Sequence, residues 1–241
     1  MFTKKAALTL LLVFGLTPVM AQEQILVVTE QWPPYNYTDK NGKIIGSATR
    51  KLKQVLDHAG ISYEIQMLAW SKAYYLAKAR PNVLIYTIYR SAERESQFQW
   101  VCPLIETKGL NVYKLASRTD IEISSLDDLK KYHLAVVKDD VSYEFLLNNG
   151  FELKRHLNVA SSEEANVRLL FNGRVDLLMQ EEAALRVRTA KAGYDFSQMK
   201  DVLTLFPEDS QKCAAFSLHT KPEVVERVKK SLQQISTQHA K

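Results

Sequence analysis

Short apolar strands alternate with amphipathic helices along most of this sequence, and that order constrains the fold more than any other feature. Residues 25–29 form a β-branched run that ends before two prolines, which predicts a buried strand opening into a loop. Apolar residues then follow helical spacing over 48–59, alternate over 61–67, and can form a second helix over 70–80 and a strand over 83–86. Strand, helix, strand, helix, strand predicts a parallel sheet covered by helices.

A second series of alternating strands and helices is predicted in the second half of the chain. Ser161 to Glu164 forms a capping box and Asp140 can cap another helix. The predicted order is a strand at 134–137, helices ending near 149 and 172, a strand at 175–179, a helix at 182–191, a strand at 214–218 and a C-terminal amphipathic helix from Pro222. No Gly/Ser-rich linker separates the two units, so we expect two lobes that meet along a cleft.

The first 21 residues have the pattern of a cleaved signal peptide. Lys4 and Lys5 precede an apolar run over residues 6–16, and small residues stand at 19–21, where a signal peptidase cleaves. A membrane anchor needs about 20 apolar residues, roughly twice what this run supplies. No cysteine lies at the cleavage site for lipid attachment, so we expect a soluble, unanchored protein in the periplasm or the extracellular space.

Composition excludes several classes of protein. The chain is 46% hydrophobic and 24% charged with 8 Gly and 7 Pro, which excludes collagen-like and wholly disordered chains. Removing the two leader lysines from 32 basic residues leaves 30 against 27 acidic ones, a net charge of +3. The charges are interspersed, so no nucleic-acid partner is expected. The five histidines are scattered without metal-ligand spacing, and no metal or cofactor is predicted.

Two cysteines, Cys102 and Cys213, leave two alternatives open. In an oxidising compartment an even pair is a disulfide candidate, which would stabilise the fold by roughly 4 to 5 kcal/mol by closing a loop of about 110 residues. Two buried thiols acting as small hydrophobic side chains would need no bond.

Several motifs, taken together and in order, are similar to those of a known family. The chain resembles the extracellular solute-binding proteins of the polar amino-acid type, family 3, which include the histidine- and glutamine-binding proteins of bacterial ABC importers. The chain is most similar to a subgroup of this family that has Glu-x-Trp-Pro-Pro-Tyr near the start, here residues 30–35, and Phe-Gln-Trp after an arginine, here Arg94. The matching stretches are 29–37, 41–46, 91–94 with 98–100, 125–129 and 172–176.

The resemblance implies an α/β fold of the bilobed periplasmic-binding-protein kind (type II), with two lobes joined by two crossover strands. Lobe 1 would hold residues 22–113 and 203–241, and lobe 2 would hold residues 114–202. Such lobes close like a hinge over a ligand. Both cysteines would lie in lobe 1 near the crossings, which favours the disulfide.

The same resemblance assigns charged residues to the ends of an amino-acid ligand. Arg94 stands where the family arginine grips the carboxylate, a task suited to the bidentate guanidinium fork; the alternative is a surface arginine paired with Glu93 or Glu95. Glu181 stands where the family has an aspartate that accepts from the ligand ammonium, although its extra methylene changes the geometry. Gln180 in that role, or a solvated Glu181 at the start of the next helix, is the alternative.

Aromatic and hydroxyl side chains are expected to form the walls of the site. Trp32 and Tyr35 follow the first strand, where a family aromatic stacks on the ligand. Trp70 adds a second wall or packs within its lobe. Thr87 and Tyr89 end the third strand, where relatives contact the ligand through hydroxyl or backbone groups, and a tyrosine there would shrink the pocket.

Asp139 and Asp140 replace the Gly-Thr pair with which relatives hold the ligand carboxylate at a helix start. Two acids there would repel an anion. We therefore expect Asp140 to face a ligand with more positive charge, or to serve only as a helix cap.

These features predict a monomeric periplasmic protein that captures a small polar ligand, such as an amino acid or related amine, and hands it to the membrane permease of an ABC importer. It needs no catalysis. One alternative is a dehydratase-like enzyme on the same scaffold, although no histidine falls on the expected site loops. The other is a ligand-sensing module that acts through a separate partner.

Overall fold

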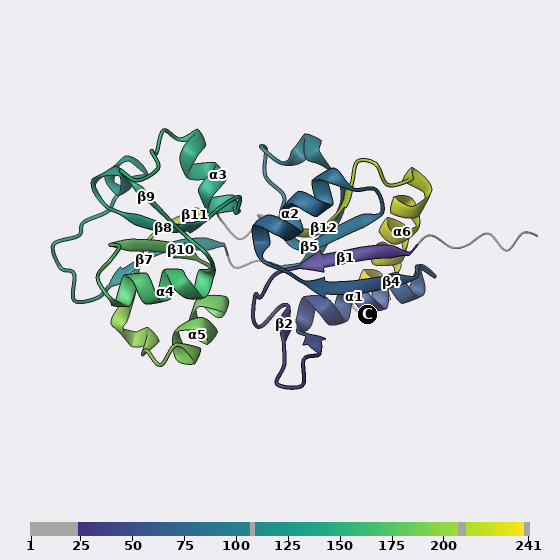
Figure 1. Ribbon diagram of the computed structural model, residues 1–241, viewed down its shortest axis with the longest axis horizontal. Helices are drawn as coiled ribbons and strands as arrows, with labels where there is room; N and C mark the ends of the chain where they lie inside the picture. Colours follow the sequence, from purple (N-terminus) through teal and green to yellow (C-terminus); the bar gives the residue numbers. More distant parts are fainter. Residues whose placement is uncertain (1–23, 107–108, 207–210, 239–241) are drawn as a thin grey trace, which may run out of the picture.

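The computed structural model describes residues 24–106, 109–206 and 211–238, which form two α/β lobes lying side by side (Figure 1). Each lobe is built on a five-stranded sheet. A small hairpin of β2 (Tyr37–Thr38) and β3 (Ile44–Ile45) extends from the first lobe, with Gly42 at positive φ in the Asn-Gly turn between the two strands. The predicted bilobed α/β fold is confirmed. The predicted signal peptide, residues 1–21, lies outside the described residues.

The sheet of the first lobe takes its strands from both ends of the chain, in the order β4-β1-β5-β12-β6. β1 (Ile25–Thr29) pairs in parallel with β4 (Tyr63–Met67) and β5 (Val83–Tyr89), as the N-terminal pattern predicts. β12 (Lys212–Ser217) lies between β5 and β6 (Phe98–Ile105) and is antiparallel to both. The last strand of the chain therefore occupies an interior position of the first sheet.

Helices cover both faces of this sheet because successive strand residues point to opposite faces. Val27 packs with α1 (Ser47–His58) and α6 (Pro222–Gln238), whereas the next residue, Val28, packs with α2 (Trp70–Ala79). Buried residues recur along α1 at helical spacing. Each face of the first sheet therefore packs against its own apolar core.

The second lobe has the strand order β11-β7-β10-β8-β9. β8 (Leu134–Val137) is parallel to β9 (Leu157–Ala160) and β10 (Leu177–Gln180). β7 (Leu110–Leu115) is antiparallel to β10 and to β11 (Met199–Phe206). The predicted strands at 134–137 and 175–179 correspond to β8 and β10, while β7, β9 and β11 were not predicted.

The helices of the second lobe also cover both faces of their sheet. α3 (Val141–Asn148) packs on one face and α4 (Glu163–Phe171) and α5 (Glu182–Lys191) pack on the other. Short 3₁₀ turns occur at Glu95–Gln97, Asp127–Lys131 and Phe196–Gln198. Across the described ranges, no helix has the length and apolar character needed to span a membrane.

The chain passes between the lobes twice, from β6 to β7 and back from β11 to β12. The sheets divide the chain a few residues away from the predicted boundaries at 113 and 202. Residues 110–113 and 203–206 lie in the second sheet because β7 and β11 pair with each other from Leu110 and Phe206 onward.

Cys102 and Cys213 form a disulfide, with an S–S distance of 2.03 Å. They lie on β6 and β12, which are neighbours in the first sheet. Of the two alternatives that the sequence leaves open, the structure has the bonded pair.

Candidate functional site

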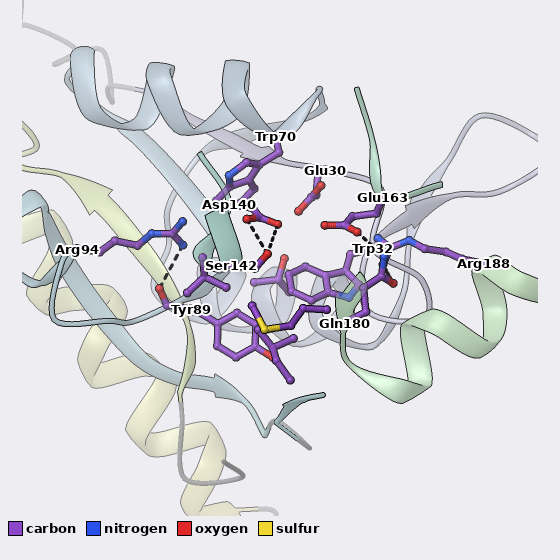
Figure 2. Close-up of a pocket in the computed structure, with 14 residues that line it drawn as sticks. Glu30, Trp32, Trp70, Tyr89, Arg94, Asp140, Ser142, Glu163, Gln180 and Arg188 are labelled. Carbon is purple, nitrogen blue, oxygen red and sulfur yellow. Dashed lines mark hydrogen bonds between the residues drawn. The ribbon is translucent and has the colours of Figure 1, made fainter. Parts of the chain in front are cut away.

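A cavity lies between the two lobes (Figure 2). The space between its lining atoms is about 420 Å³, the opening to solvent included. Its lining combines aromatic rings with charged side chains. The first lobe contributes Glu30, Trp32, Trp70, Thr87, Tyr89 and Arg94, and the second contributes Leu110, Asp140, Val141, Ser142, Glu163, Met179, Gln180 and Arg188.

The loop after β1 brings Glu30 and Trp32 to the cavity. The Trp32 N–H donates to the Asn36 carbonyl at 2.6 Å, which closes the loop into a tight turn. Gly46, at φ 122°, lies against this turn: a Cβ atom there would stand 2.1 Å from the carbonyl oxygen of Tyr35. Only glycine fits this close approach, so Gly46 fixes how the loop meets the start of α1.

The end of β5 brings Thr87 and Tyr89 to the cavity through an irregular strand. Thr87 has φ 58°, a left-handed conformation that β-branched residues rarely adopt. The pairing of β5 with β12 shifts register beside it, between Cys213 and Ala214. Backbone strain of this kind costs about 1–3 kcal/mol and is concentrated at functional sites.

Arg94 is buried, with 1% of its side chain exposed, and connects the lobes. Its Nε donates to Glu144 on α3 at 2.6 Å, and its Nη2 donates to the Asp139 carbonyl at 2.9 Å. The guanidinium also lies over the rings of Trp70 and Tyr74, at 5.4 and 5.0 Å from their centroids. These contacts fix the guanidinium in one orientation at the edge of the cavity.

The backbone of Asp139 takes part in the same contact between the lobes. The residue has φ 63°, and its carbonyl oxygen accepts from the Trp70 Nε1 at 2.6 Å as well as from Arg94. Trp70 therefore both lines the cavity and packs in the core beneath α2.

A buried ion pair between Glu181 and Lys212 forms a second connection between the lobes. Both side chains are 0% exposed. The Tyr35 hydroxyl donates to the other Glu181 oxygen at 2.5 Å. Three aromatic rings surround the ammonium, with the centroids of Trp32, Tyr35 and Tyr89 at 4.5, 4.3 and 5.1 Å from Nζ. Burial lowers the pKa of Lys212, whereas the carboxylate and the ring faces stabilise its charged form.

Arg188 on α5 makes a third connection. Its Nη2 donates to the Gln31 carbonyl of the first lobe at 2.9 Å, and its Nη1 donates to Gln180 at 2.9 Å. Its Nε faces Glu164 at 3.3 Å. The guanidinium thus holds the loop that carries Trp32 against the second lobe.

Three acidic side chains, Glu30, Asp140 and Glu163, lie around one part of the cavity (Figure 2). Burial, with the nearby acids and opposed by Arg188, raises the pKa of Glu30 to about 8. Burial and the Glu163 carboxylate also raise the pKa of Asp140 well above its usual value. Both shifts favour the protonated forms of Glu30 and Asp140, and a cation placed beside these two groups would favour their ionisation.

The model of the bacterial extracellular solute-binding proteins, family 3, matches residues 25–240. The chain belongs to this family. The resemblance drawn from the sequence motifs is confirmed.

Solved structures share the bilobed fold of this family 3 protein. A histidine kinase sensor domain with similarity to periplasmic binding proteins is 18% identical with a TM-score of 0.77, covering 91% of this chain and 92% of that one. An ancestral arginine-binding protein bound to arginine is 19% identical with a TM-score of 0.75, covering 89% and 92%. The arginine-, lysine-, histidine-binding protein ArtJ from Geobacillus stearothermophilus is 18% identical with a TM-score of 0.74, covering 90% of each chain. No curated protein sequence matches the chain.

The structure brings six of the eight predicted ligand-binding residues of the family 3 protein to the cavity: Trp32, Trp70, Thr87, Tyr89, Arg94 and Asp140. Arg94 is not the surface arginine of the alternative interpretation. Asp140 caps α3 by accepting from the Tyr143 N–H, and it also lines the cavity, so it is more than a helix cap in its placement. Contact of these residues with a ligand stays a prediction.

Tyr35 and Glu181 do not line the cavity. The predicted role of Glu181 as an acceptor for a ligand ammonium disagrees with its placement, because Lys212 and Tyr35 already occupy its two oxygens. The solvated alternative disagrees as well, since Glu181 is fully buried. The Lys212 ammonium therefore occupies the position beside Glu181 where the motif comparison predicted the ligand ammonium.

Glu30, Glu163 and Arg188 line the cavity and were missed by the sequence analysis. Glu163 was interpreted only as part of a capping box, and the Ser162 side chain does cap α4. Glu30 directly follows a predicted buried strand, a position where polar residues often face a site, and that signal was available. Among the described residues, no cluster of His, Cys, Asp or Glu has the arrangement of a metal site.

Proposed function

We propose that this family 3 protein is exported to the periplasm by residues 1–21, binds a small polar solute there as a monomer, and releases it to the permease of an ABC importer. The solute is an amino acid or a related amine. Binding in the cavity drives hinge closure because the ligand has a higher affinity for the closed form. The arginine bound to the ancestral protein, and the cationic amino acids named for ArtJ, support an amine-bearing solute.

The observation that carries this proposal is a pair of polar groups at the cavity whose hydrogen-bonding capacity is not satisfied by the described residues. The Trp32 Nε1–H is buried and has no acceptor among them. No described side chain or backbone group donates a hydrogen bond to the Glu30 carboxylate. Buried polar groups are normally partnered, so a donor and an acceptor in one cavity are suited to a polar ligand.

A thermal-shift screen of protein purified from a bacterial periplasm tests the proposal, with amino acids, polyamines and dicarboxylates as probes. A specific ligand at one hundred times its Kd stabilises the folded state by about 2.7 kcal/mol, which raises Tm by about 5–10 °C for a chain of this size. Mass spectrometry of the recovered ligand should find it unchanged. Absence of any shift would contradict the binding function, and turnover would favour the enzyme.

Replacing Arg94 by Ala is expected to weaken binding of the solute identified by the screen about thirtyfold. The closed form loses its ion pair with Glu144 and the hydrogen bond to Asp139, and truncating a buried charge pair costs about 2 kcal/mol or more. Calorimetric titration measures the affinity. Arg90→Ala is the matched control, because Arg90 pairs with Glu95 at the exposed surface. Equal affinities of the two variants for the solute would show that Arg94 does not contribute to hinge closure.

Sensing is a second candidate function, favoured by the similarity to a histidine kinase sensor domain. Both functions need the same ligand binding and hinge closure. Uptake of the labelled ligand in cells with and without the gene separates them: transport predicts loss of uptake, and sensing predicts unchanged uptake with an altered transcriptional response.

A further inference from the structure

The groups assigned by the sequence motifs to the two ends of an amino acid are already engaged within the protein. The Arg94 guanidinium is ion-paired with Glu144 and donates to backbone carbonyls of both lobes. Lys212 and Tyr35 occupy the Glu181 carboxylate. A ligand carboxylate would meet a guanidinium whose charge is already neutralised by Glu144, and a ligand ammonium would have to displace Lys212 from the buried Glu181 carboxylate.

Acceptors for a cation are open elsewhere in the cavity. Asp140 accepts from the Tyr143 N–H and the Ser142 hydroxyl, and Glu163 accepts from Asn166 and Gln180. An ionised carboxylate has about four lone-pair sites, so both retain accepting capacity. Glu30, which lies between Asp140 and Glu163 in Figure 2, accepts no hydrogen bond from a described group.

The charges that face this part of the cavity do not balance. Glu30 follows β1, Asp140 precedes α3, and Glu163 and Glu164 begin α4, while Arg188 on α5 is the cation that faces them. The N-termini of α3 and α4 stabilise their own acids, but Glu30 lies at neither. Arg188 is itself shared with Glu164, Gln180 and a backbone carbonyl. Four carboxyl groups face one guanidinium, so the site favours additional positive charge.

The rest of the lining is aromatic. Trp32, Trp70 and Tyr89 line the cavity and present surfaces that favour an apolar chain or a cation. The unpartnered Trp32 Nε1–H is an independent sign that a ligand belongs here. No described cluster has metal-site geometry, so an organic cation fits the lining better than an inorganic one.

We propose that the cavity takes a small organic cation that carries an ammonium or guanidinium group and lacks a carboxylate. This inference rests on the proposed binding function and narrows its ligand class. Glu30, Asp140 and Glu163 hold the cationic group, and the aromatic walls hold the rest of the molecule. Arg94 and Lys212 act within the protein, through Glu144 and Glu181, to hold the lobes together.

Matched pairs of probes that differ by one carboxylate test the proposal: arginine with agmatine, lysine with cadaverine, and ornithine with putrescine. In calorimetric titrations at pH 7.5, at least one decarboxylated probe is expected to bind ten times or more tightly than its amino acid. If the amino acid binds equally well or better, the ligand class is wrong and the binding function stands. If no probe of either kind, and no compound of the wider screen, binds, both proposals fail.

Substitutions in the acidic group give a second test with the same probes. Glu163→Gln and Glu30→Gln are expected to weaken binding of the decarboxylated probe by tenfold or more, while circular dichroism shows an unchanged fold. Glu182→Gln, an exposed glutamate paired with Arg186, is the control and should bind as the unsubstituted protein does. Unchanged affinity in both cavity variants would overturn the assignment.

The pH dependence distinguishes a direct contact from a structural effect. With its pKa near 8, Glu30 must lose its proton when a cation binds below that pH. Affinity for a probe that stays protonated is expected to rise about tenfold per pH unit from pH 6 to 7 and to level off above about pH 8. Glu30→Gln should reduce this dependence to the part that Asp140 contributes through its own raised pKa. Affinity that falls with rising pH in the unsubstituted protein would overturn the role of Glu30.

Discussion

Replacing Glu181 by Gln is expected to remove about 3–5 kcal/mol of stability from the closed form of the protein, because it leaves the Lys212 ammonium buried without its counter-charge. Glu181 and Lys212 belong to different lobes and are both fully buried. Opening of the hinge would hydrate the ammonium, so the loss should shift the protein toward the open form before it unfolds the lobes. Small-angle X-ray scattering measures the shift as a larger radius of gyration.

Two further variants make this expectation specific. Glu182→Gln changes the next residue, which is exposed, and should leave the radius of gyration unchanged. Combining Glu181→Gln with Lys212→Met removes both charges and should restore much of the closed form, since apolar replacement of a buried ion pair is often tolerated. A Glu181→Gln variant as compact as the unsubstituted protein would show that the pair does not hold the lobes together.

Loss of the Cys102–Cys213 bond should produce the other large effect. The bond closes a loop with a sequence separation of 111, and removing such a constraint costs about 4–5 kcal/mol on the chain-entropy model. The double Cys102→Ser and Cys213→Ser variant is expected to unfold at a Tm lower by about 10 °C or more. Differential scanning calorimetry measures the change.

Reduction of the unsubstituted protein is the matched control for the serine variants. It breaks the same bond without replacing either sulfur atom, so its Tm should agree with that of the double variant within a few degrees. A Tm unchanged by both treatments would show that the pairing of β6 with β12 holds this part of the sheet without the bond.

The α/β lobes could be predicted because their signals are local. The β-branched run at residues 25–29 and the helix at 182–191 coincide with β1 and α5. The strands β7 and β11 were missed because each is stabilised by pairing with the other across a separation of about ninety residues, as Leu110 opposite Phe206 illustrates. Such pairing leaves a weak pattern in either segment alone.

The candidate site was less predictable because its contacts cross between lobes. Arg94 could be placed near the ligand from its motif, but its partner Glu144 lies 50 residues away on another lobe. Lys212 gave no signal, since a fully buried lysine is uncommon and its pairing with Glu181 depends on closure of the two lobes. The placement of Thr87 at the cavity was predicted from the motif comparison, but the register shift beside it was not, because side-chain alternation does not reveal such a shift.

The place of β12 between β5 and β6 has a consequence for how the chain acquires its structure. Residues 110–206 contain all five strands of the second sheet, so that lobe can form as soon as this stretch is available. The first sheet cannot be completed until residues 212–217 are available, and before then β5 and β6 each have an edge that lacks its β12 partner. Such non-local assembly is slow, and edge strands left open invite pairing with other chains. A factor that shields these edges should therefore raise the yield of folded protein most during the interval before residues 212–217 are released.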